Sequence, residues 1–245
     1  MTLKAVLFDF GGVLTKACWD THEIAKLVAQ ALIDAGITPP EELIDTMRNT
    51  LDQRLLKVIK TQIEERMEDI IVEVLRKLDV PFNNTVISRA LDYIMDAPFC
   101  QFREETDEVI KTLKKWGLKL GIVSNSPIAF HRRILKKRGL LAYFDAIIIS
   151  CEVMYRKPHP EIFRIALNRL KVKPQEAIFI GDDLEIDIKG AKRVGIRGIL
   201  IRNGDPYWLS RKKYLKISSD ENIDPDYIIN SLREMLDIIK REIFL

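Results

Sequence analysis

Asp9 is the first residue of the sequence whose type and surroundings could do chemistry. It ends the apolar run 5–8 and is followed by Gly11 and Gly12. An aspartate carboxylate can act as a covalent nucleophile, and glycines let the backbone come close to a ligand. An aspartate that only caps a loop or the start of a helix would fit the same residues.

A second polar segment, Ser124-Asn125-Ser126-Pro127, follows the apolar run 120–123. Pro127 suits the first position of a helix and Ser126 the cap before it, so we expect a helix to begin here. A hydroxyl group and backbone N–H groups at a helix N-terminus can bind an anion. An ordinary helix cap would have the same sequence.

Lys157 stands between Arg156 and two prolines, Pro158 and Pro160. The prolines predict a rigid, extended approach to a helix that begins near Glu161. An ammonium group held there could neutralise both a carboxylate and a bound anion. A lysine exposed on the surface would fit equally well.

Four acidic residues lie within six positions after the apolar run 177–180: Asp182, Asp183, Glu185 and Asp187. Carboxylates this close repel one another unless a cation lies among them. Their hard oxygen atoms suit Mg²⁺, which typically takes one or two protein carboxylates. A magnesium site competes here with a solvated acidic turn.

The elements that must position these groups follow from the pattern of apolar residues. Short continuous runs at 5–8, 120–123, 147–149, 177–180 and 198–201 are typical of strands buried on both faces, and segments of helical period separate them. This alternation predicts an α/β fold with a parallel, doubly wound, Rossmann-like sheet. Ligands of such sheets bind at the carboxyl ends of the strands. Because the polar segments fall at such ends, we expect them to form one site.

Residues 16–98 interrupt the alternation, because no strand pattern occurs between Thr15 and about Pro98. Apolar residues at helical spacing run through 22–35 and through 41–80, where two or three helices are expected. We therefore predict an α/β core of residues 1–15 and 99–245 and an all-α insertion of residues 16–98. The apolar stripe at 41–80 would form the core of a small bundle or, alternatively, a coiled coil that binds a partner.

Composition excludes several classes of protein. Of the 245 residues, 47% are hydrophobic, which excludes a disordered chain. The formal net charge of +3 gives no reason to expect nucleic acid as a partner, and no apolar run approaches the ~20 residues of a membrane span. Cys18, Cys100 and Cys151 lack metal-ligand spacing and favour a reducing compartment. We expect a cytoplasmic monomer or homodimer that binds neither nucleic acid nor membrane.

The four segments, in this order, resemble the motifs of the haloacid dehalogenase superfamily of phosphohydrolases and relatives. AVLFDFGGVL at 5–14 resembles the first motif and IVSN at 122–125 the second. RKPHPEIF at 156–163 resembles the third, and FIGDDLEIDIKGA at 179–191 the fourth. The insertion resembles the helical cap of the first type in this family. The subgroup most resembled contains the phosphatase domain of epoxide hydrolases and sugar-phosphate phosphatases.

The resemblance implies a hydrolase of a small phosphorylated metabolite that works through an aspartyl-phosphate. It implies that Asp9 is the nucleophile and that Ser124 and Lys157 are catalytic with it. It also implies that Gly12, Ser124, the Asn125 backbone and Lys157 bind the phosphate group.

The same resemblance implies a magnesium cofactor. Asp9, the Gly11 carbonyl and Asp182 would hold the ion, and Asp187 would belong to the same metal site. Asp183 would support bound water or act as an acid or base. Such a cofactor fits phosphoryl transfer, which depends on positioning and on neutralisation of charge.

One position departs from the pattern, because Gly11 stands where most phosphatases of this superfamily carry a second aspartate. That aspartate is a general acid/base, a group that contributes roughly 10²–10⁴ in rate. Another group could replace it, with Asp183 the first candidate and His22 or a lysine of the insertion next. Alternatively, the leaving group could need little protonation.

The third explanation is that the reaction is dehalogenation of a 2-haloacid through an aspartyl ester, since a halide leaves without a proton. The paired acids at 182–187 argue against it, because they would repel the carboxylate of a 2-haloacid. A catalytically weakened binding or regulatory protein is a further alternative.

Residues of the insertion that face Asp9 would recognise the leaving group. Five are available for this role: Trp19, His22, Arg48, Arg54 and Lys57. The insertion would open and close about hinges near Thr15 and Pro98 to admit the substrate.

Overall fold

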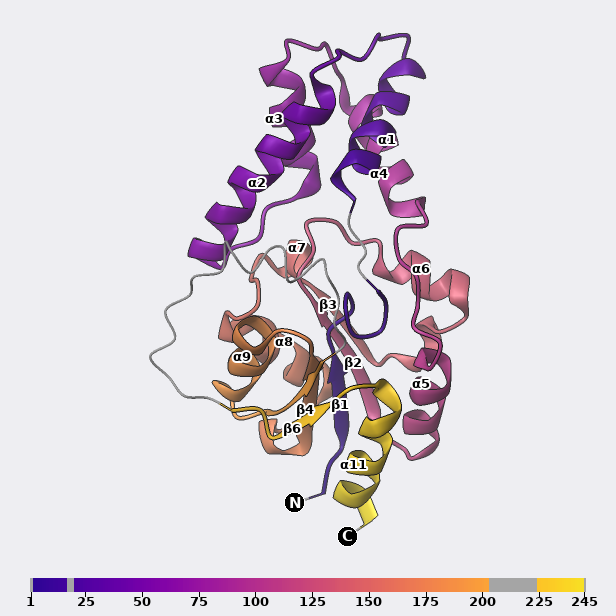
Figure 1. The fold of residues 1–245 in the computed structure, drawn as a ribbon, viewed down its shortest axis with the longest axis vertical. Coiled ribbons are helices and arrows are strands. Elements are labelled where there is room, and N and C mark those ends of the chain that lie inside the picture. Colours follow the sequence, from indigo (N-terminus) through magenta and orange to yellow (C-terminus); the bar gives the residue numbers. More distant parts are fainter. Residues whose placement is uncertain (1, 17–19, 203–223, 245) are drawn as a thin grey trace.

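A single parallel sheet lies at the centre of the fold, which is known from a computed structural model that describes residues 2–16, 20–202 and 224–244. Six strands of the described chain pair in the order β3-β2-β1-β4-β5-β6 (Figure 1). They are β1 (Ala5–Phe8), β2 (Lys119–Ser124), β3 (Ala146–Ile149), β4 (Ala177–Gly181), β5 (Arg197–Ile201) and β6 (Tyr227–Ile229). The order leaves β1 in the middle, beside both β2 and β4.

Helices cover both faces of this sheet (Figure 1). One face carries α5 (Thr106–Lys115), α6 (His131–Arg138) and α11 (Leu232–Phe244), and the other carries α8 (Pro160–Leu170) and α9 (Lys189–Lys192). Shorter turns are α7 (Ser150–Val153), η1 (Leu141–Tyr143), η2 (Pro174–Glu176) and η3 (Leu184–Ile188).

Strand β1 shows why the strands are continuously apolar. Val6 and Phe8 pack into the buried cluster that includes α5 and α11, whereas Ala5 and Leu7 pack into the cluster around α8. All four residues are buried, because a strand covered on both faces has no solvent side. The doubly wound α/β sheet predicted from the sequence is therefore confirmed.

Four helices lie between β1 and α5 and stand over the carboxyl edge of the sheet (Figure 1). They are α1 (Thr21–Ile33), α2 (Leu43–Thr61), α3 (Met67–Lys77) and α4 (Asn84–Asp96). The segment 41–80 therefore holds two helices, separated at Gln62, whose φ of 55° is left-handed and ends α2.

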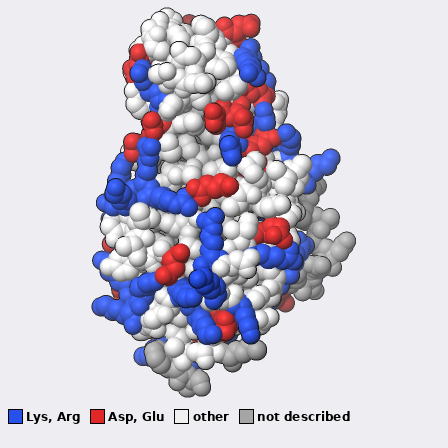
Figure 2. Space-filling model, turned by 180° about the vertical axis from the view of Figure 1, so that it is seen from behind, with Lys and Arg blue, Asp and Glu red and all other residues white. Residues whose placement is uncertain are grey.

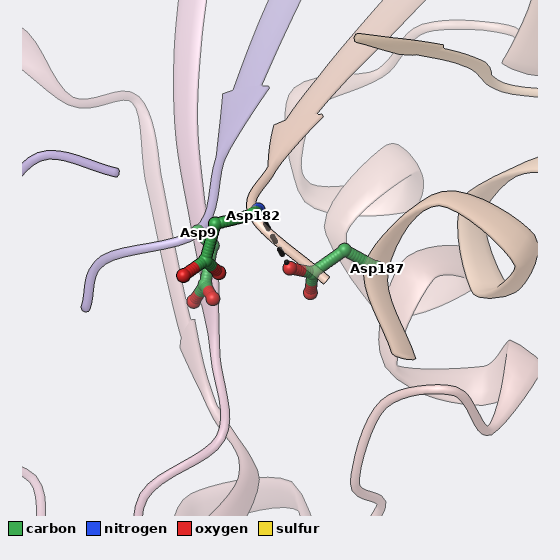
Figure 3. Close-up of side chains that lie close together, drawn as sticks. All are labelled: Asp9, Asp182 and Asp187. Atoms are coloured by element: carbon green, nitrogen blue, oxygen red, sulfur yellow. Dashed lines mark hydrogen bonds between the residues drawn. The ribbon is translucent and has the colours of Figure 1, made fainter. Parts of the chain in front are cut away.

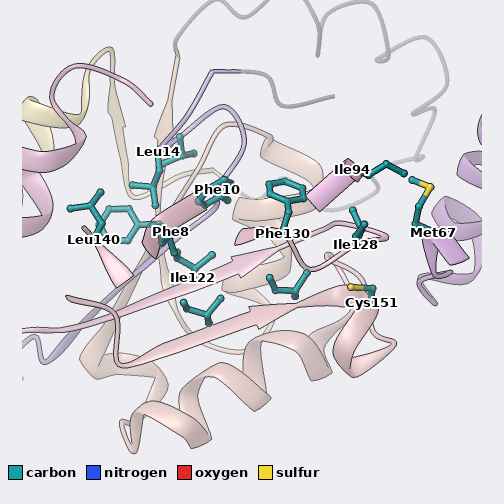
Figure 4. Packing of buried hydrophobic residues seen from close by; sticks show 14 of the residues in the cluster. Phe8, Phe10, Leu14, Met67, Ile94, Ile122, Ile128, Phe130, Leu140 and Cys151 are labelled. Carbon is teal, nitrogen blue, oxygen red and sulfur yellow. The ribbon is translucent and has the colours of Figure 1, made fainter. Parts of the chain in front are cut away.

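The apolar residues of these helices join the core on the α5 side of the sheet. Met67 of α3 and Ile94 of α4 belong to the same buried cluster as Ile128 and Phe130, which follow β2 (Figure 4). Of the stripe at 41–80, Leu43, Met47, Met67, Ile70 and Val74 are buried. Much of the stripe thus packs inside the protein, as a bundle's own core does.

The helix expected at Pro127 does not form, so that prediction is wrong. The Ser126 hydroxyl donates to the Ile128 carbonyl at 2.7 Å and accepts from the Ile128 N–H at 3.3 Å. A serine that bonds to nearby backbone groups competes with helix formation. The helix α6 consequently begins only at His131.

The surface opposite the view of Figure 1 carries Lys and Arg side chains interspersed with Asp and Glu (Figure 2). Within the described residues, none of the helices combines the length and the apolar character needed to cross a membrane. Cys151 is a buried free thiol.

Candidate active site

Segments that are far apart in the sequence meet at the carboxyl edge of the sheet. Asp9 follows β1, Ser124 ends β2 and Asp182 follows β4. Because β1 pairs with both β2 and β4, Asp9 lies between Ser124 and Asp182 along this edge. The Asp9 N–H donates to the Ile180 carbonyl at 2.9 Å. Here the strand order reverses direction, which is where open α/β sheets bind ligands.

Lys157 is the cation of this edge and lies between two carboxylates. Its Nζ is 2.8 Å from Asp9 Oδ1 and 2.7 Å from Asp187 Oδ1, and all three residues are buried. Burial lowers the pKa of Lys157, but the charges of Asp187 and Asp9 outweigh that effect, so its pKa is raised overall. The lysine is thus held as an ammonium ion.

Asn125 fixes the backbone of that lysine. Its side-chain amide donates to the Lys157 carbonyl at 3.0 Å, and its Oδ1 accepts from the Lys157 N–H at 2.8 Å. This reciprocal pair ties the end of β2 to the segment before α8. The Asn125 side chain therefore has a positioning task, in addition to the backbone role expected from the sequence.

The carboxylates of Asp9, Asp182 and Asp187 converge at this edge of the sheet (Figure 3). One oxygen each of Asp9, Asp182 and Asp187 lies within 4.8 Å of the others. Burial raises the pKa of Asp9 to about 6, with Asp187 adding to the shift and Lys157 opposing it. Burial, together with the charges of Asp187 and Asp9, raises the pKa of Asp182 well above its usual value. One lysine does not balance two buried acids and a half-buried one, so the cluster lacks positive charge.

This cluster fits a hard divalent cation. Asp182 Oδ1 is buried and has no hydrogen-bond partner among the described residues. Buried polar atoms normally have a partner, so an unpartnered carboxylate oxygen beside two further acids points to an ion. Carboxylate oxygens are the ligands that Mg²⁺ prefers.

Two glycines make room for these carboxylates. A Cβ atom on Gly12, whose φ is +79°, would lie 2.1 Å from Asp182 Oδ2, and one on Gly181 would lie 2.3 Å from the Cβ of Asp187. Any side chain at either position would displace an acid of the cluster. Gly11 differs, because a Cβ atom there would meet nothing within 4 Å of the described chain.

Asp187 and Asp183 also organise the loop after β4. Asp187 Oδ2 accepts from the N–H groups of Asp182 and Asp183 at 3.2 and 3.1 Å. Asp183 Oδ1 accepts from the N–H groups of Glu185 and Ile186, both at 2.8 Å, and so caps η3. Asp183 lines the cleft described below, but these contacts give it the geometry of a helix cap.

A cleft of about 150 Å³ lies over Asp9, between the sheet edge and the helical insertion. Of the five residues proposed to recognise a leaving group, Arg54 lines it. His22, Arg48 and Lys57 are exposed, and Trp19 lies outside the described residues.

Several contacts at the site have no recognisable signal in the sequence. Arg103 donates through Nη2 to the Gly12 carbonyl at 2.8 Å and so holds the loop after β1. Glu64, from the insertion, is buried and contacts Ser150 Oγ and Arg156 Nη1, both at 2.6 Å. Their partners lie more than 80 residues away in the chain, which no local pattern could reveal.

His131 is a further residue whose position the sequence does not reveal. It is followed by Arg132 and Arg133, a basic pattern typical of a solvated helix face. It is nevertheless buried, with Nε2 3.0 Å from Ser124 Oγ. Burial, with the nearby charges of Arg132 and Lys157, lowers the pKa of His131 to about 3. The ring is therefore neutral.

Known proteins resemble this chain in both sequence and fold. A glyceraldehyde 3-phosphate phosphatase of Methanopyrus kandleri is 29% identical over 242 residues, which is 97% of each chain. A haloacid dehalogenase-type phosphatase of Thermococcus onnurineus has 26% identity and a TM-score of 0.60 over 97% of this chain and 98% of that one. A 2-haloacid dehalogenase of Pseudomonas syringae shares the fold, with 22% identity and a TM-score of 0.63 over 98% and 99%.

The family of haloacid dehalogenase-like hydrolases matches residues 3–195, which hold all four motifs. The match extends from before Asp9 to beyond Asp187 and thus includes the whole candidate site. On this evidence, the chain belongs to the haloacid dehalogenase-like hydrolases.

Proposed function

We propose that this protein is a magnesium-dependent phosphomonoester hydrolase that acts through an aspartyl-phosphate on a small metabolite. The observation that carries the proposal is the convergence of Asp9, Lys157 and two further acids, Asp182 and Asp187, below a cleft. A relative that spans nearly the whole chain is named a phosphatase, which supports the same activity.

In the first step, the Asp9 carboxylate attacks phosphorus and a bond forms between its oxygen and phosphorus. The ester bond breaks, and the leaving oxygen takes a proton from solvent water to become an alcohol. Lys157 and the Phe10 N–H, at 2.8 and 2.7 Å, hold Asp9 Oδ1 and so orient the carboxylate. Water then attacks phosphorus and the bond from Asp9 to phosphorus breaks, which releases inorganic phosphate, restores the Asp9 carboxylate and returns one proton to the solvent. Ser124 and the Asn125 backbone would hold the phosphoryl oxygens through both steps.

Asp9, Asp182 and the Gly11 carbonyl would hold Mg²⁺, with Asp187 fixing the surrounding loop. When bound, the ion neutralises charge on the phosphoryl group and orients it towards the nucleophile. Lys157 contributes one positive charge at the same place. The two cations together would offset the repulsion between the acids and an incoming phosphate dianion.

The lining of the cleft on the insertion side indicates what kind of leaving group fits. Leu51, Leu55, Val58 and Ile70 are apolar and line the cleft on this side. An uncharged leaving group suits these walls. Such a group is consistent with the triose phosphate in the name of the archaeal relative.

Arg54 does not offer a free charge to a second anionic group. Its guanidinium donates to Glu65 at 2.5 Å and to Glu73 at 2.7 Å. Because two carboxylates already satisfy it, a bisphosphate or a phosphorylated acid would gain little from this residue. We therefore propose a substrate with a single phosphate and an uncharged remainder.

Residues 16–98 would act as the cap over this cleft. Besides the two chain connections, the segment 62–67 contacts the core, with Glu64 N–H donating to the Met154 carbonyl and Met67 N–H to the Pro127 carbonyl, each at 2.8 Å. Substrate entry would break these contacts while the connections near Thr15 and Pro98 act as hinges.

Hydrolysis of p-nitrophenyl phosphate tests the proposal, measured with Mg²⁺, with a chelator, and for Asp9→Asn. We expect activity that depends on Mg²⁺ and a loss of at least about 10³-fold for Asp9→Asn, because Asp9 is the residue that would form the covalent intermediate. A panel of small sugar phosphates, bisphosphates and 2-chloropropionate then separates the substrate classes. Turnover that survives both the chelator and Asp9→Asn, or halide release without phosphatase activity, would refute it.

A further inference from the structure

His131 lies directly behind Ser124, at the first position of α6. Its Nε2 is 3.0 Å from Ser124 Oγ, and only 1% of the residue is exposed. The imidazole stacks on Phe130, with centroids 4.3 Å apart and planes at 11°, and meets Phe10 edge-on at 4.6 Å. These two aromatic contacts fix the orientation of the ring and therefore the direction of Nε2.

The proton of the neutral ring can be assigned to one nitrogen. Nδ1 is buried and has no hydrogen-bond partner in the described part of the chain. A buried N–H without an acceptor is rarer than a buried acceptor without a donor. The proton therefore belongs on Nε2, where it has Ser124 Oγ as its acceptor.

This donation determines what the Ser124 hydroxyl can do. A serine hydroxyl has one hydrogen to donate and two lone pairs to accept. When Nε2–H occupies a lone pair, the O–H cannot turn towards His131, so it is directed to a group on the other side. Ser124 and His131 both line the cleft over Asp9.

We propose that His131 is a positioning residue that donates Nε2–H to Ser124 Oγ and thereby presents the Ser124 hydroxyl hydrogen to the phosphoryl oxygen of the substrate. The inference rests on the proposed phosphatase function, in which Ser124 binds the phosphate. It goes beyond that function because it makes a residue outside the four motifs part of phosphate recognition. A ring that only fills space between Phe10 and Phe130 would leave Ser124 unaffected.

The experiment compares His131→Gln with His131→Leu. The Gln amide nitrogen can occupy the place of Nε2 and donate to Ser124, whereas Leu preserves bulk and donates nothing. We expect His131→Leu to lower kcat/KM for p-nitrophenyl phosphate about 10-fold, which corresponds to ~1.4 kcal/mol, and to weaken competition by inorganic phosphate by a similar factor. His131→Gln should retain kcat/KM to within about 3-fold.

The same pair is then made in Ser124→Ala protein. Because the proposed effect passes through the Ser124 hydroxyl, His131→Leu should change kcat/KM less than about 2-fold in this background. An equal loss with and without Ser124, or a loss in His131→Gln as large as in His131→Leu, would overturn the proposal. Thermal unfolding of every variant identifies losses that come from instability.

Nitrogen NMR of the wild-type protein with ¹⁵N-labelled histidine identifies which ring nitrogen of His131 carries the proton, and it needs no variant. We expect the proton of His131 on Nε2, and a proton on Nδ1 would overturn the inference. If the wild type fails to hydrolyse p-nitrophenyl phosphate, the proposed function fails, while the tautomer still tests the bond to Ser124. The two failures are therefore distinguishable.

Discussion

Replacement of Gly12 by alanine perturbs the site at a single, defined contact. Gly12 has a left-handed φ of +79°, and an added Cβ atom would lie 2.1 Å from Asp182 Oδ2 and 2.7 Å from Asp182 Cγ. The neighbouring Gly11 provides a matched control, because its Cβ atom would meet nothing within 4 Å of the described residues and its φ is not left-handed. The two variants add the same methyl group at adjacent positions of the chain.

Two costs add up for Gly12→Ala. A residue other than glycine in the left-handed region costs roughly 1–2 kcal/mol. In addition, the Asp182 carboxylate must retreat, since Cβ contacts below 3.0 Å are essentially never found in proteins. At about 2–4 °C per kcal/mol for a chain of this size, the backbone cost alone lowers Tm by roughly 2–8 °C.

The displaced carboxylate should also weaken metal binding, because Mg²⁺ tolerates little departure from its ideal geometry. Displacement of groups that orient a metal site typically costs about 10–100-fold in affinity, and we expect a loss in this range for Gly12→Ala. Calorimetric titration with Mg²⁺ and thermal unfolding of the metal-free protein measure the two effects. Equal Tm and equal affinity in Gly12→Ala and Gly11→Ala would refute the reasoning.

Two further predictions concern pH and the contact between insertion and core. Burial raises the pKa of Asp9 from 3.8 in the unfolded chain to about 6 in the folded, metal-free protein. The contribution of protonated Asp9 to the free energy of unfolding is therefore complete below pH 3.8 and is lost as the pH rises through 6. The loss is on the order of 2–3 kcal/mol, and we expect Mg²⁺ to raise Tm more at pH 7 than at pH 5; equal shifts would contradict this. Glu64→Ala leaves the mostly buried Arg156 without this partner and should cost about 2 kcal/mol or more in urea unfolding. Glu23→Ala, which removes an exposed pair with Lys26, should cost less than about 0.5 kcal/mol, and similar losses in both variants would exclude a stabilising role for Glu64.

The sheet and the meeting of its polar segments could be predicted from the sequence, for a local reason. A strand covered on both faces must be apolar at every position, so runs such as Ala5–Phe8 are visible without any knowledge of their neighbours. Parallel strands then bring their carboxyl ends to one edge. That rule alone places Asp9, Ser124 and Asp182 at the same edge of the sheet.

The partners of single polar side chains depend on contacts that no local pattern contains. His131 lies in a basic cluster that resembles a solvated helix face, yet Phe10, from a different strand end, covers it. Glu64 is paired with Arg156 across 92 positions of the chain. Whether a polar group is buried, and with which partner, is decided by the packing of distant segments. The apolar pattern of a chain therefore determines its layers. The protonation states, the ion pairs and the side-chain orientations within the site are decided only when those layers pack together.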